Sequence, residues 1–172
     1  MIQQFATLGN IVIMSDLLSS ANSPLPARIP LAALLPGLLG LAPFWALAFA
    51  AIAGAGIDPL LALTALIMYG AIILSFVGAL WWGLAVHAPS TAPRATLFIW
   101  SVIPALIGWF ATLALPDVGL RMLMAGLALQ WVLDGMLMRK VPGLIPSWMF
   151  RLRTMLTFGA LGALGLAWWQ LI

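Results

Sequence analysis

Few side chains in this sequence have the chemistry of a catalytic or metal-binding group. The 172 residues include one histidine and four aspartates, and there is no cysteine or glutamate. A typical metal site takes three or four such ligands, and thiolate chemistry needs cysteine. The sequence also lacks a phosphate-binding glycine loop and a plausible Ser/His/Asp arrangement. We therefore expect no catalytic set, no metal site and no cofactor.

Asp134 is the one acid that falls inside a long hydrophobic stretch. It follows Gln130 by one helical turn, so both side chains project from the same helix face. It also precedes Met138, where the stretch ends, by about one turn. Because a charge within a membrane is costly, such a residue usually has a partner or a function.

Several basic side chains are expected near Asp134, at the same end of the hydrophobic stretches. The predicted polar cluster consists of Asp134, Gln130, Arg151, Arg153 and His87. The depth of Asp134 and the number of nearby bases favour an ion pair between the fourth and fifth stretches. A proton relay or a ligand site is the alternative. Asp117 and Arg121, one turn apart, are predicted to form a local helix pair.

The amino-acid composition indicates what class of protein must position this polar cluster. Only 6% of residues are charged and 65% are apolar, whereas soluble domains have about 25% and about 45–50%. So few charges could not cover the surface of a soluble domain. This excludes a water-soluble globular domain, a disordered chain and a nucleic-acid-binding module. The expected partner is the lipid bilayer, with no nucleic acid.

Five continuous apolar stretches are each long enough to cross the bilayer as a helix, which takes about 20 residues. A membrane barrel would show short segments of alternating polarity instead. The sequence predicts an all-α fold, a multi-pass helical bundle with five transmembrane helices in residues 31–172. The predicted spans are 31–53, 60–86, 95–115, 120–138 and 154–172.

The positive residues are distributed unevenly between the two sides of this bundle. Asp58, Asp117 and Arg121 fall on one side, and six of the seven Lys and Arg residues fall on the other: Arg28, Arg94, Arg139, Lys140, Arg151 and Arg153. Cytoplasmic loops carry the excess of Lys and Arg. We predict a bacterial cytoplasmic (inner) membrane protein with its N-terminus in the cytoplasm and its C-terminus outside.

Two further features concern the membrane surface. Residues 1–30 are predicted to be a cytoplasmic tail, in which apolar residues at helical spacing suggest a short amphipathic helix; a translation start at Met14 is the alternative. Trp81, Trp82 and Trp148 fall near predicted span ends and are expected to be interface aromatics.

Four segments carry a resemblance to a known family. The first segment, 69–83, contains the pairs Tyr-Gly, Ser-Phe and Trp-Gly, and the second is Trp-Ser-Val-Ile-Pro at 100–104. The third, 129–134, begins with Leu-Gln and ends with Asp. The fourth, 146–157, contains a Trp, then Arg-Leu-Arg, and ends with Leu-Thr. In this order they resemble bacterial and mitochondrial proteins similar to transmembrane protein 69, which have a domain of unknown function. The resemblance covers roughly Pro30 to Leu171 and implies a five-helix membrane protein with no established activity.

One departure from this resemblance affects the functional interpretation. Trp81 stands where the resemblance implies a His or Arg before the Trp-Gly pair. Unless His87 substitutes for that basic residue, the departure argues against a catalytic role.

Three functional hypotheses remain. Small size, short loops and small-residue helix faces favour a non-enzymatic accessory or assembly subunit of a larger membrane complex. A small transporter or channel is the second, and a dry bundle with Asp134 paired to Arg151 or Arg153 would count against it. The third is a lipid- or quinone-modifying membrane enzyme that uses Asp134, His87 and the nearby arginines.

Overall fold

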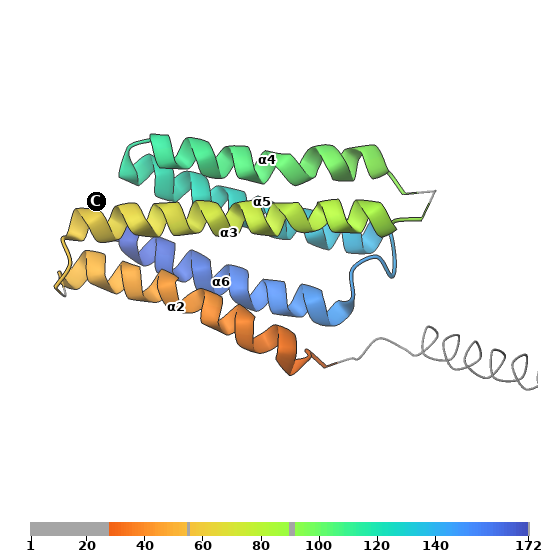
Figure 1. Cartoon of the computed structure of the whole chain (residues 1–172), viewed down its shortest axis with the longest axis horizontal. Helices are drawn as coiled ribbons and strands as arrows, with labels where there is room; N and C mark the ends of the chain where they lie inside the picture. Colours follow the sequence, from red (N-terminus) through yellow and green to blue (C-terminus); the bar gives the residue numbers. More distant parts are fainter. Residues whose placement is uncertain (1–27, 55, 90–91, 172) are drawn as a thin grey trace, which may run out of the picture.

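The computed structural model describes residues 28–54, 56–89 and 92–171, and these form five α-helices and no strand (Figure 1). The helices are α2 (Leu31–Ala53), α3 (Pro59–His87), α4 (Arg94–Leu113), α5 (Pro116–Lys140) and α6 (Ser147–Trp169). The predicted all-helical fold is confirmed for these residues. The helix ends lie close to the predicted ones, except that α5 starts a turn earlier and α6 begins at Ser147 instead of 154.

Four of the five helices, α2 to α5, are long and apolar enough to cross a membrane. Helix α6 has the length of a span, at 23 residues, but Arg151, Arg153 and its small and polar residues lower its mean hydropathy. These four helices fit a multi-pass membrane protein. The predicted surface helix of the tail and the choice between Met1 and Met14 concern residues 1–27, which lie outside the described part of the chain.

Local sequence signals account for several helix ends. Asp58 caps α3 by accepting a hydrogen bond from the Leu61 N–H at 3.0 Å, and Pro59 occupies the first helical position, as the Asp-Pro pair predicts. Helix α2 ends at Gly54 in the left-handed conformation, with φ of 60°. Glycine adopts this conformation without the steric cost that a side chain would add.

Helix α3 is the central element of the bundle and packs against α2, α4 and α5, while α6 packs against α2 and α5. All five helices run roughly along the long axis of the molecule (Figure 1). The N-terminal half of α2 diverges from the others, and Pro36 and Pro43 lie within this helix. The Tyr69 hydroxyl of α3 donates to the Gly40 carbonyl of α2 at 2.8 Å, close to where Pro43 cannot supply a backbone donor.

Helices α3 and α4 are in especially close contact because glycines face the partner helix. A Cβ at Gly78 would lie 2.6 Å from Cγ of Pro104, and one at Gly108 would lie 2.9 Å from the carbonyl oxygen of Ala71. Neither position can take a side chain without moving a helix. This is the close packing that small residues provide in membrane bundles.

The buried apolar side chains form two clusters. The larger, around Phe44, Leu66, Leu123 and Leu164, fills the middle of the bundle. The smaller, around Trp81, Leu97 and other residues, lies at the end where α3 and α5 finish and α4 begins. On α5 the larger cluster reaches Leu127 and the smaller includes Leu137, so a buried polar layer lies between them.

Candidate functional site

The buried face of α5 directs two polar side chains into the bundle. Its buried residues include Leu123, Leu127, Gln130, Asp134 and Leu137. They recur every three or four residues, which keeps them on one side of the helix. Gln130 is 1% exposed and Asp134 is 0% exposed. Both side chains therefore need their partners within the protein.

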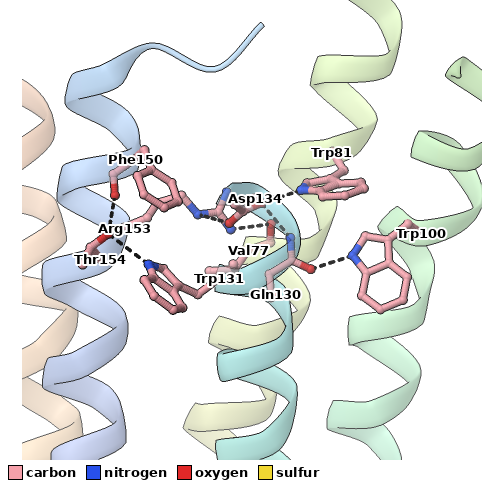
Figure 2. Close-up of polar contacts among 9 residues, drawn as sticks. All are labelled: Val77, Trp81, Trp100, Gln130, Trp131, Asp134, Phe150, Arg153 and Thr154. Atoms are coloured by element: carbon pink, nitrogen blue, oxygen red, sulfur yellow. Dashed lines mark hydrogen bonds and ion pairs between the residues drawn. The ribbon is translucent and has the colours of Figure 1, made fainter. Parts of the chain in front are cut away.

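Arg153 on α6 supplies the counter-charge for Asp134 (Figure 2). Its Nε lies 2.8 Å from Oδ2 of Asp134, and its side chain is 9% exposed. The contact is an ion pair by distance, although the N–H is not directed at the oxygen with hydrogen-bond geometry. Nη2 donates to the Val77 carbonyl of α3 at 3.3 Å, and Nη1 is buried without a hydrogen bond to a described residue.

Two neutral donors complete the surroundings of the carboxylate. Oδ1 of Asp134 accepts from Trp81 Nε1 at 2.6 Å and from Gln130 Nε2 at 3.1 Å. The side-chain oxygen Oε1 of Gln130 accepts in turn from Trp100 Nε1 at 2.8 Å. These five residues, Trp81, Trp100, Gln130, Asp134 and Arg153, form what we call the buried polar network, which connects α3, α4, α5 and α6 (Figure 2).

A second polar contact joins α5 to α6 beside this network. Trp131 Nε1 donates to the Thr154 hydroxyl at 3.0 Å, and that hydroxyl donates to the Phe150 carbonyl at 2.9 Å. The Trp131 ring also meets Phe158 edge to face, with centroids 5.4 Å apart. Hydrogen bonds and aromatic contacts together hold α5 and α6 side by side.

The geometry of the network determines what chemistry it can support. The Asp134 carboxylate is fully enclosed, and each of its oxygens has a partner on another side chain. An acid or base that exchanges protons with a substrate needs the substrate within hydrogen-bond reach. In the described ranges, no group of three or more His, Cys, Asp or Glu side chains lies close enough to bind a metal. The arrangement is that of a cross-link between helices.

A family model described as "Protein of unknown function (DUF3429)" matches residues 29–169. The chain belongs to the DUF3429 family. The match spans all five helices and the whole buried polar network. No curated protein and no solved structure matches the chain. These comparisons show no link between DUF3429 and transmembrane protein 69.

The structure of this DUF3429 chain brings together three of the five residues of the predicted polar cluster: Asp134, Gln130 and Arg153. Arg151 is exposed, and its Nε contacts the Ser147 carbonyl of its own helix at 3.4 Å. Two residues along a helix rotate by about 200°, so Arg151 and Arg153 face opposite sides. His87 is also exposed, and its Nδ1 lies 2.9 Å from the Gly83 carbonyl oxygen.

The three tryptophans predicted at the membrane interface have different surroundings. Trp82 is 54% exposed and Trp148 is partly exposed, but Trp81 is buried at 5% exposure. Trp81 lies on the buried face of α3, in line with Leu74, Gly78 and Ala85. This spacing of three and four residues is visible in the sequence and could have identified Trp81 as an inward-facing donor.

The buried polar network also contains Trp100, for which the sequence predicted no place in a site. Its indole N–H is committed to Gln130, and its ring lies 6.1 Å from that of Trp81 between centroids. Tryptophan has one donor and no acceptor. Trp100 is partly buried, and a tryptophan within the apolar stretch of a neighbouring helix is therefore the sequence signal for a donor to Gln130.

Proposed function

We propose that this DUF3429 chain is a non-enzymatic accessory or assembly subunit of a larger membrane complex. The observation that carries the proposal is the complete enclosure of Asp134 among Arg153, Trp81 and Gln130. The other described acids lie at helix starts: Asp58 caps α3, and Asp117 is in the first turn of α5. Because Asp134, the one acid inside the bundle among the described residues, joins helices, the described residues favour a structural role.

The same observation weighs against the two competing functions. A transporter or channel needs a polar path through the bundle, and a headgroup-modifying enzyme needs an acid or base open to the membrane surface. Two apolar clusters instead flank the network, and Trp81 belongs to the smaller of them. Asp134, which carries the carboxylate, is 0% exposed. A bundle with many large apolar side chains on its outside is suited to contacts with lipid and with other membrane proteins.

The proposal includes five spans, with α6 as the fifth. Arg153 lowers the hydropathy of α6, but its charge is buried against Asp134 and not exposed to lipid. Helix α6 is 23 residues long and lies along the bundle with the other four (Figure 1). An internal ion pair makes a charged residue tolerable within a membrane, which supports treating α6 as a span.

We further propose that the N-terminus is cytoplasmic, the C-terminus is outside, and the membrane is the bacterial cytoplasmic membrane. The start of α2, the end of α5 and the start of α6 are at one end of the bundle, together with most Lys and Arg residues (Figure 1). The chain has no cysteine, so single cysteines report topology directly. Pro142→Cys should react with a membrane-impermeant thiol reagent only after lysis, and Ile57→Cys in intact cells. The reverse pattern would contradict the orientation.

We also propose that the family relationship extends to proteins similar to transmembrane protein 69. Support comes from three of the segments that carry the resemblance, at 100–104, 129–134 and 146–157, because each contains a member of the buried polar network at a position that fits the resemblance. In the segment 69–83 the network member is Trp81, where this chain departs from the resemblance. On this proposal these three segments are alike in both groups of proteins because Trp100, Gln130, Asp134 and Arg153 connect α4, α5 and α6 in the same way.

The accessory role is tested by native co-purification. The tagged chain, expressed at its native level, is extracted in a mild detergent, and co-purifying proteins are identified by mass spectrometry and sized by gel filtration. We expect one or a few membrane proteins in constant proportion to the tagged chain. A matched sample of the Asp134→Ala variant should lose them if the network maintains the docking surface. Elution of the wild-type chain as a lone monomer would overturn the proposal.

A further inference from the structure

A cavity of about 250 Å³ lies where the end of α3, the start of α4 and the end of α5 meet. Its lining includes Trp81, Thr96, Trp100, Leu133, Leu137 and Lys140. We call it the α3–α5 cavity. Whole drug-sized ligands occupy about 300–1,000 Å³, so this volume suits one part of a larger molecule.

The lining of the cavity is apolar, even where it contains tryptophan. The indole N–H of Trp81 is donated to Asp134 and that of Trp100 to Gln130. The two rings therefore present apolar surface to the cavity, together with Leu133 and other apolar side chains. Such a wall stabilises an apolar occupant and offers little to a polar one.

The cavity has one basic residue in its lining, at the end of α5. Lys140, the last residue of α5, lines it directly, and Arg139 and Arg94 lie at the same end of the bundle. Within the described ranges the acids do not offset this charge. Asp58 and Asp117 begin helices at the opposite end, and Asp134 is enclosed and paired with Arg153.

We propose that the α3–α5 cavity binds an anionic phospholipid, with one acyl chain along the tryptophan wall and the phosphate at Lys140. From Lys140 to Leu133 the helix extends about 10 Å, a depth that matches the upper part of a lipid chain. A basic group above an apolar pocket between membrane helices is the arrangement that selects anionic headgroups. This inference does not depend on the accessory role proposed above.

The headgroup is tested on the full-length protein purified in mild detergent. Phosphatidylglycerol and phosphatidylcholine with identical acyl chains are added, and binding is measured by native mass spectrometry and by the thermal midpoint, which a bound ligand raises. We expect phosphatidylglycerol to bind more tightly and Lys140→Gln to lower its affinity about fivefold without affecting phosphatidylcholine. Arg151→Gln is the matched control. It removes one positive charge from α6 at the same end of the bundle, and α6 does not line the cavity, so this variant should change the affinity for phosphatidylglycerol less.

The acyl-chain position is tested by filling the cavity. Thr96 and Ala95 are neighbouring exposed residues of α4, and only Thr96 lines the cavity. Thr96→Trp should therefore reduce phosphatidylglycerol binding while Ala95→Trp should not. Should Thr96→Trp fail to fold, the comparison of Lys140→Gln with Arg151→Gln decides the proposal.

The proposal that the α3–α5 cavity binds an anionic phospholipid would be overturned by equal binding of the two lipids, or by equal effects of Lys140→Gln and Arg151→Gln on phosphatidylglycerol binding. Equal effects of Thr96→Trp and Ala95→Trp, when both variants fold, would overturn it as well. So would stabilisation of the protein by an isoprenoid quinone but not by phosphatidylglycerol.

Discussion

Helix α5 contributes the aspartates of two aspartate–arginine pairs that have opposite surroundings. At its start, Asp117 and Arg121 are 2.5 Å apart and their side chains are 43% and 54% exposed. Near its end, Asp134 meets Arg153 of α6 at 2.8 Å, and the two are 0% and 9% exposed. The charged groups are the same in both pairs. Differences in stability between them must come from burial and from the elements that each pair connects.

The two pairs also differ in what they organise. Asp117 and Arg121 belong to consecutive turns of one helix, so their contact requires only that α5 be helical. Asp134 and Arg153 belong to different helices, and their contact fixes how α5 is aligned with α6. The buried pair has further donors from α3 and α5 in place of water. Buried networks of this kind are costly when a partner is lost.

The largest effect is expected when the buried pair is broken. Arg153→Met leaves the Asp134 carboxylate buried without a counter-charge, and losses of about 3–5 kcal/mol are typical of such changes. The free energy of unfolding, measured by denaturant titration in mixed micelles, should fall by this amount. Asp134→Asn should also lower it, because Arg153 is then buried without its counter-charge, although an amide oxygen can still accept from Trp81 and Gln130.

The double variant Asp134→Leu, Arg153→Met is the control for this prediction. Replacing both charges by apolar groups removes the unpaired ion, and such replacements are often close to neutral. Here recovery should be partial, because Trp81 Nε1 and Gln130 Nε2 then lack their acceptor. A double variant less stable than Arg153→Met alone would contradict the assignment of these residues as partners.

A smaller effect is expected from the neutral donors of the network. Trp81→Phe keeps an aromatic ring but removes the N–H that Asp134 accepts at 2.6 Å. Hydrogen bonds to charged groups contribute about 1.5–3 kcal/mol. Trp100→Phe removes a bond to an uncharged amide, and such bonds between membrane helices average about 0.6 kcal/mol.

These two losses are measured by the same unfolding titration. Trp82→Phe, on the exposed side of α3, is the matched control and should leave stability unchanged. Equal losses in the Trp81 and Trp100 variants would mean that the charge of Asp134 adds nothing to its hydrogen bond.

The comparison of the two pairs also shows what could be predicted from the sequence. The local pair follows from spacing alone, since residues four apart on a helix are neighbours. The same rule places Gln130 and Asp134 on one face, and the long apolar stretches predict the helices around them. Composition and periodicity act within a single segment, so they are sufficient for the elements and for local contacts.

The partner of Asp134 on α6 could not be chosen by such rules. Arg151 and Arg153 both open the last helix, and the choice depends on how α6 is rotated against α5. The face with Arg153 continues through Ala160, Leu164 and Ala167, all buried. Gly159 and Gly162 of the same helix form a second face of small residues. These glycines face Leu41 and Trp45 of α2, so both faces pack, and the sequence pattern did not identify which one faces α5.

The smallest effect is expected when the exposed pair is broken, because water already solvates both groups. Arg121→Gln should lower the free energy of unfolding by no more than about 0.5 kcal/mol, the usual contribution of an exposed pair on a helix. That difference should decrease further in high salt, which screens exposed charges beyond a few ångströms. The loss caused by Arg153→Met should be nearly independent of salt, since ions do not reach the enclosed carboxylate. A salt-sensitive loss at Arg153, or a loss above about 1 kcal/mol at Arg121, would mean that the two pairs do not differ in the way that their burial implies.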